Sequence, residues 1–182
     1  NKLLGEQGTA QVFGPQKGAS PVDVDKLDIA LAQLAKVVLK ETAIDISRLK
    51  YGGAAGGAAA SLHAILNAGL VNGIEYFLDL TDFDSSLKRS DLVITGEGSI
   101  DLQTLHGKGP YGVARRAKKR GVQVIGLAGN VPLKQEGRFH QYFDVLMAIG
   151  NKPSDLAAAL SNTPANISRT SREIGNLLAM RP

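Results

Sequence analysis

The residues best equipped for chemistry lie close together in the segment 91–108. A short apolar run is followed within a dozen positions by the carboxylates Glu97 and Asp101 and by the cation Lys108. Phosphoryl transfer uses groups of these kinds: oxygen ligands for Mg²⁺, an acceptor for a hydroxyl proton and a cation for developing negative charge. Singly, Asp101 can be a turn cap and Lys108 a solvated surface residue. Their density in one segment favours a binding or catalytic site.

Glycines accompany these side chains and recur earlier in the chain. Gly96 and Gly98 follow the apolar run directly, where they allow the backbone to approach a ligand. Gly53, Gly56 and Gly57 precede an alanine-rich segment that favours helix. Free N–H groups before a helix N-terminus can cradle an anion, although close packing of small residues explains the cluster equally well. The segment is not a Walker A sequence, because no Lys-Ser/Thr pair follows it.

Lys17 lies among turn-forming residues, where it either reaches an anion or is an ordinary surface lysine.

The composition of the chain excludes several kinds of site and partner. The chain has no cysteine, which excludes disulfides and thiolate metal sites. The net charge is +4, but aromatic residues make up only 5%, so the basic segment 115–120 is interpreted as a solvated helix face and not as a nucleic-acid surface. Without a membrane-length apolar run or a signal-peptide pattern, we expect a cytoplasmic protein with no membrane partner.

The elements that must position these residues alternate between strands and helices. Ser20 and Pro21 predict the start of an amphipathic helix over 21–40, and Gly69 is expected to end the helix after the glycine cluster. Helices are also predicted at 74–80, 85–88, 110–120, 154–160 and 167–180, and strands at 92–95, 122–127 and 144–149. The strands are apolar throughout, as in parallel sheets covered on both faces.

This pattern predicts an α/β fold with a layered, mostly parallel sheet flanked by helices. Residues 81–182 are expected to form the C-terminal part of a flavodoxin-like or Rossmann-like domain. Residues 1–80, with the glycine-rich loop, are expected to form the C-terminal part of a second α/β domain.

Three motifs, taken in order, resemble the bacterial type of the glycerate kinase family. They are Asn1-Lys-Leu-Leu-Gly-Glu6 with Phe13-Gly-Pro-Gln-Lys-Gly-Ala19, then Gly53-Ala-Ala-Gly-Gly57, and then Val93-Ile-Thr-Gly-Glu-Gly-Ser-Ile-Asp101 with His106-Gly-Lys108. The resemblance implies ATP-dependent phosphorylation of D-glycerate, usually at the 2-hydroxyl, with Mg²⁺. It implies that Asp101 binds Mg²⁺ transiently or accepts the proton, and that Lys108 neutralises phosphate charge. Substrate or nucleotide would be bound by Lys17, Gly53, Gly56, Gly57, Gly96, Glu97 and Gly98.

Members of that family are longer, and the matching segment is their C-terminal half. The resemblance therefore implies that an N-terminal half of the same protein is a partner of residues 1–182. A parallel sheet without its remaining strands exposes its edges, so we expect residues 1–182 alone to be poorly soluble. The alternative interpretation is a non-catalytic module of the same fold that binds a small acid or a nucleotide.

Overall fold

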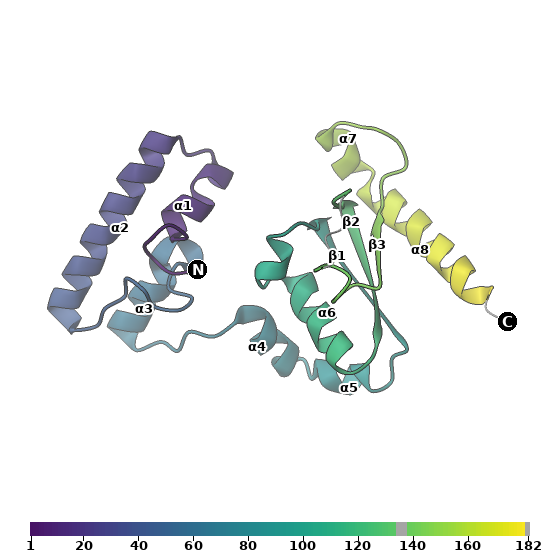
Figure 1. Cartoon of the computed structure of the whole chain (residues 1–182), viewed down its shortest axis with the longest axis horizontal. Coiled ribbons are helices and arrows are strands. Elements are labelled where there is room, and N and C mark those ends of the chain that lie inside the picture. Colours follow the sequence, from purple (N-terminus) through teal and green to yellow (C-terminus); the bar gives the residue numbers. More distant parts are fainter. Residues whose placement is uncertain (134–137, 181–182) are drawn as a thin grey trace. The chain divides into compact units, whose positions relative to one another are not determined.

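The chain folds as two compact units, Asn1–Asn72 and Gly73–Pro182. The computed structural model describes residues 1–133 and 138–180 (Figure 1). Within these residues, no helix combines the length and the apolar character that crossing a membrane requires. The predicted boundary at residue 80 falls at the end of a helix, Gly73–Leu80 (α4), which packs on another helix of the second unit.

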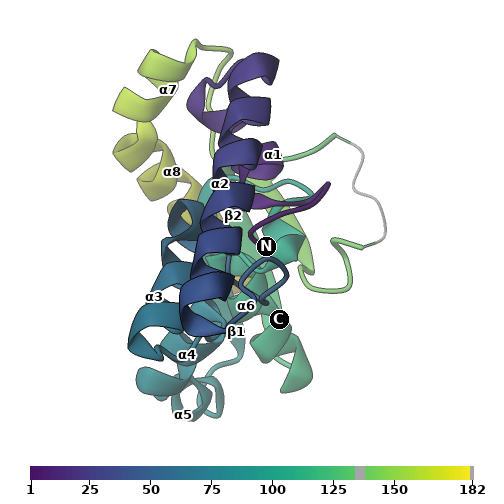
Figure 2. The ribbon, with the colours of Figure 1, turned by 90° about the vertical axis from the view of Figure 1, so that its left-hand side faces the viewer.

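The first unit is helical in its described structure. Its elements are α1 (Thr9–Phe13), η1 (Pro15–Lys17), α2 (Pro21–Thr42), η2 (Ala54–Gly57) and α3 (Ala58–Leu66). The long helix α2 packs against α1 and α3 (Figures 1 and 2). The buried apolar residues of this unit come from the N-terminal segment, α2, the following loop and α3: Leu3, Ala35, Val38, Ile46, Ala60 and Ala64.

Local sequence signals explain where these helices begin and end. Ser20 caps α2 as predicted: its hydroxyl accepts a hydrogen bond from the Asp23 N–H, and the Asp23 carboxylate accepts one from the Ser20 N–H. The helix α3 ends at Leu66, before the predicted Gly69. Asn67 takes the left-handed cap position with φ 53°, which asparagine tolerates better than most residues.

The second unit is built on a three-stranded parallel sheet in the order β1-β2-β3. The elements along the chain are α4, α5 (Phe83–Leu87), β1 (Leu92–Ser99), η3 (Thr104–His106), α6 (Gly109–Lys119), β2 (Gln123–Asn130), β3 (Val145–Ala148), α7 (Leu156–Ser161) and α8 (Thr163–Ala179). The predicted α/β class with a parallel sheet flanked by helices is confirmed.

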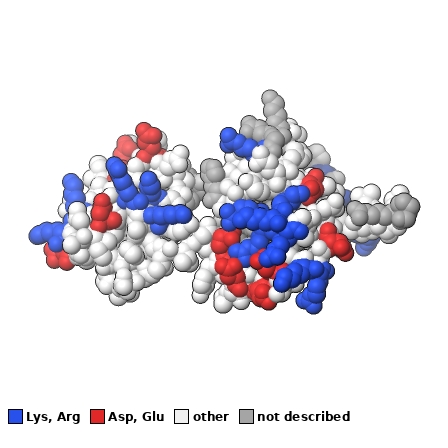
Figure 3. All heavy atoms as spheres, turned by 60° about the horizontal axis from the view of Figure 1, so that its bottom comes forward, with Lys and Arg blue, Asp and Glu red and all other residues white. Residues whose placement is uncertain are grey.

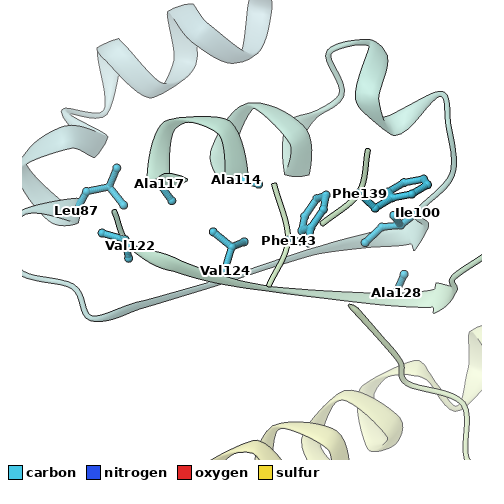
Figure 4. Packing of buried hydrophobic residues seen from close by; sticks show 9 residues of the cluster. All are labelled: Leu87, Ile100, Ala114, Ala117, Val122, Val124, Ala128, Phe139 and Phe143. Atoms are coloured by element: carbon cyan, nitrogen blue, oxygen red, sulfur yellow. The ribbon is translucent and has the colours of Figure 1, made fainter. Parts of the chain in front are cut away.

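Helices pack on both faces of this sheet, although Ile94 of β1 remains 48% exposed. Figure 4 shows α6 above one face, with Ala114 and Ala117 directed toward Val124 and Phe143. On the other face, Ile174 of α8 packs with Leu127 and Ile149. The β1–α6–β2 succession therefore places the end of β1 next to the start of α6, and this arrangement holds the polar segment that follows β1.

The strand β1 is longer than the predicted strand 92–95. It pairs with β2 up to Ser99, opposite Asn130, so Gly96 and Gly98 lie within the strand and not in a loop after it. The reason is a close backbone approach at Gly96. A Cβ there would lie 2.4 Å from the carbonyl oxygen of Leu127, so only glycine lets the two strands continue side by side.

The basic segment on α6 is largely paired with acidic side chains. Figure 3 shows Lys and Arg groups lying among Asp and Glu groups on one face of this unit. The ion pairs join α6 and its C-cap residue to α4, α5 and the residue before β3: Arg115–Glu75, Arg116–Glu75, Arg116–Asp79, Lys118–Asp144 and Arg120–Asp84. Most of the positive side chains of α6 are thus paired with carboxylates of the same unit.

Candidate active site

The structure brings Glu97, Asp101 and Lys108 together where β1 ends and α6 begins. Lys108 is the N-cap residue of α6. Its Nζ atom lies 3.9 Å from Oε2 of Glu97 and 3.7 Å from Oδ1 of Asp101. The side chain of Lys108 is 41% exposed and that of Asp101 46%. Exposed ion pairs at such distances contribute little to the stability of the fold. The three charged side chains are therefore accessible to a ligand.

A buried threonine holds this cluster in place. Thr104 is fully buried, and its hydroxyl donates to Oε1 of Glu97 while it accepts a hydrogen bond of 3.1 Å from the Asp101 N–H. The hydroxyl therefore links both carboxylate residues. The sequence prediction assigned no role to Thr104, although a polar residue between Asp101 and the helix start is a usual signal for a side-chain cap.

Asp101 has a structural and an open oxygen. Oδ1 accepts hydrogen bonds from the N–H groups of Gln103 (2.8 Å) and Thr104 (3.1 Å), which is the turn cap considered for this residue. Within the described part of the chain, Oδ2 accepts no hydrogen bond. The cap fixes the carboxylate in position without using the second oxygen, so a structural and a ligand-binding role are compatible. The side chain of His106, from the same motif, lies outside the described residues.

The two glycines of β1 differ in their surroundings. At Gly96 the neighbouring strand occupies the space that a side chain would need. At Gly98 a Cβ would meet nothing within 4 Å, so the backbone is open on that side. Of the two, Gly98 is the one at which a ligand could approach the backbone next to Glu97.

In the first unit, Lys17 and Gly56 line one pocket of about 600 Å³. It lies between the α1–η1 turn, the N-terminal half of α2 and the η2 loop. Gly53 and Gly57 do not line it. The Gly53 N–H, expected to be a free donor, donates to the carbonyl of Asn1. A Cβ on Gly57 would lie 2.6 Å from Leu3, so this glycine fits the packing interpretation.

The expected site residues therefore fall into two groups, one in each unit. Lys17 and Gly56 belong to the first unit, and the Glu97, Asp101 and Lys108 cluster belongs to the second. Among the residues that the structure describes, no set of three or more His, Asp or Glu side chains is placed to cage a metal ion. Two carboxylates suit Mg²⁺ that is shared with phosphate and water, because this ion often takes only one or two protein ligands.

Comparison with known proteins shows the relationship. The model of the glycerate kinase family matches residues 1–179. The chain belongs to the glycerate kinase family. A glycerate kinase of Halalkalibacterium halodurans is 38% identical over 174 residues, which cover 96% of this chain and 46% of that protein. A glycerate 2-kinase of Escherichia coli (strain K12) is 41% identical over 185 residues, which cover 99% and 47%.

A solved member of the family agrees in fold. It is the crystal structure of a protein from Salmonella typhimurium LT2 that is provisionally assigned as glycerate kinase 2. It matches with a TM-score of 0.66 at 41% identity, over 98% of this chain and 46% of that chain. This chain thus spans about half the length of the curated glycerate kinases it matches, and the matched part is their C-terminal half.

Proposed function

We propose that the protein transfers the γ-phosphoryl group of ATP to the 2-hydroxyl group of D-glycerate by direct in-line displacement, giving ADP and 2-phosphoglycerate. The observation that carries this proposal is the convergence of Lys108, Glu97 and Asp101 at the end of β1 in a chain that matches glycerate kinases along its length. In parallel α/β sheets, ligands bind beyond the carboxyl ends of the strands, where this cluster lies.

Lys108 supplies the positive charge in this proposal. Phosphoryl transfer spreads negative charge over the oxygens of the transferred group, and a fixed cation stabilises that charge. Lys108 stands at the N-terminus of α6, where the partial positive charge of the helix adds to its own. The carboxylates of Glu97 and Asp101 lie 3.9 Å and 3.7 Å from its ammonium group, so the three charged groups share one space before a ligand binds.

Asp101 is the proposed ligand of Mg²⁺ or acceptor of the hydroxyl proton. Its Oδ1 atom is anchored by backbone N–H groups, which leaves Oδ2 for either role. When bound, Mg²⁺ would neutralise phosphate oxygens and align them for transfer. Glu97 is held by Thr104 and offers a second carboxylate to the same space. Gly98, Lys17 and Gly56 are proposed to contact substrate or nucleotide.

Product identification tests the proposal. The whole protein is incubated with D-glycerate, ATP and Mg²⁺, and the products are analysed by ³¹P NMR, which distinguishes 2-phosphoglycerate from 3-phosphoglycerate. The expected result is stoichiometric ADP and one phosphoglycerate isomer, with none when D-glycerate is omitted. Binding of D-glycerate or nucleotide without any product would instead favour the non-catalytic module.

A further inference from the structure

The pocket of the first unit has a size and a lining that suit a nucleoside better than a small acid. Its volume of about 600 Å³ is within the range of roughly 300–1,000 Å³ that drug-sized ligands occupy. Phe13, Leu27 and Leu31 line it. Phe13 is 37% exposed and Leu27 45%, so both present apolar surface that the unit itself does not cover.

The polar side chains of the pocket are mostly committed elsewhere. The Thr9 hydroxyl donates to the carbonyl of Gly53. Oδ2 of Asp23 accepts hydrogen bonds from both the backbone and the hydroxyl of Ser20 in the cap of α2. In the described part of the chain, Lys17 forms no ion pair or hydrogen bond through its side chain. The pocket therefore combines apolar walls with the cation of Lys17 and with the carboxylate of Asp23, which is engaged in the cap of α2.

D-glycerate does not match that lining. A small hydroxy acid is recognised through several polar contacts to its carboxylate and hydroxyl groups, because unpaired polar groups in a pocket are costly. A nucleotide matches it, since its base is a flat ring that packs on aromatic and aliphatic side chains, and its phosphates accept contacts from a lysine.

We propose that this pocket binds the nucleoside part of the phosphoryl donor, with the base against Phe13 and Leu27 and with Lys17 on a phosphate. This inference rests on the proposed kinase function and deepens it, because it assigns the nucleotide to the first unit.

The test separates base from phosphate recognition in the whole protein. Isothermal titration calorimetry measures the binding of adenosine, ADP and D-glycerate to Leu27→Trp, which fills the pocket, and to Lys17→Ala. The matched controls are Ile29→Trp and Lys26→Ala, two exposed positions of α2 that do not line the pocket. Ala54→Phe fills the pocket from the η2 loop and replaces Leu27→Trp if thermal melting shows that variant to be unstable.

The expected pattern is selective. Leu27→Trp should weaken both adenosine and ADP at least about tenfold, and Lys17→Ala should weaken ADP about tenfold while leaving adenosine within about twofold. D-glycerate binding should not change. Weakened D-glycerate binding with intact adenosine binding would overturn the proposal, and so would unchanged affinities or equal effects in the controls. If no phosphoglycerate forms but this adenosine pattern holds, the kinase proposal fails and the nucleoside pocket stands.

Discussion

Replacing Thr104 by valine removes the hydroxyl that joins Glu97 to Asp101 while keeping the volume of the side chain nearly constant. Two hydrogen bonds are lost, one from the Asp101 N–H and one to a charged carboxylate. A neutral hydrogen bond contributes about 1 kcal/mol and one to a charged group about 1.5–3 kcal/mol. The side chain of Glu97 is 20% exposed, so water can replace part of the loss. We expect the free energy of unfolding to fall by about 2 kcal/mol.

The same change should reduce turnover. Without the Thr104 hydroxyl, Glu97 can leave its position and Lys108 loses one of its two carboxylate neighbours. Misplacing a catalytic group by about 1 Å can cost on the order of a hundredfold in rate, so we expect kcat to fall by about ten- to a hundredfold, with a smaller change in KM.

Urea unfolding followed by circular dichroism measures the loss of stability. Steady-state kinetics of the whole protein measures the loss of turnover. Thr104→Ser keeps the hydroxyl and should retain most of the turnover while losing about 1 kcal/mol from the missing methyl group. Thr81→Val is a control, because the hydroxyl of this residue, which directly follows α4, donates to carbonyl groups of α4 and, in the described part of the chain, to no carboxylate. Equal turnover and equal stability in Thr104→Val and Thr104→Ser would refute the positioning role.

Three further predictions concern the charged cluster, the ion pairs between α4 and α6, and the glycines of β1. Asp101→Asn and Lys108→Ala should each lower kcat of the whole protein by about a hundredfold or more, and near-normal turnover in both would remove the assignment. Burial raises the pKa of Glu75, but hydrogen bonds from two arginines of α6 outweigh it and hold the pKa below the ordinary 4.5. Above pH 4.5, the free energy of unfolding in urea should therefore be about 1 kcal/mol higher for the wild type than for Glu75→Gln. This difference should vanish as the pH falls through the lowered pKa of Glu75. A difference that does not depend on pH would contradict the prediction. Gly96→Ala should lower the free energy of unfolding by about 1–3 kcal/mol, because its Cβ meets the backbone of β2. Gly98→Ala should leave the free energy of unfolding unchanged and weaken ligand binding. Similar urea unfolding curves for both variants would contradict this difference between the two glycines.

Local signals predicted much of the fold. Ser20 and Pro21 located the start of α2 because capping and the fixed φ of proline act within a single turn. The apolar runs that begin at Leu92, Val122 and Val145 located the three strands in a similar way, although Ile94 and Val145 are partly exposed and these strands are not covered throughout on both faces. The ends of elements were less predictable. Pairing with β2 lengthened β1, and pairing depends on residues distant in sequence.

The glycine cluster of the first unit shows the same limit of prediction from sequence. From the sequence, anion binding and close packing explained Gly53, Gly56 and Gly57 equally well. The choice depends on neighbours contributed by the N-terminal segment: Lys2 lies against Gly53 and Leu3 against Gly57, while Gly56 lines the pocket.

The sequence by itself determined the family, the α/β class and the residue types available for phosphoryl transfer, because ordered motifs and apolar periodicity are properties of the chain. Tertiary structure alone decided how those residues are supported. It placed Lys108 between Glu97 and Asp101, joined both carboxylate residues through buried Thr104, and set Lys17 beside an apolar pocket. Distances between side chains on different elements follow from packing and strand register, which no local pattern encodes.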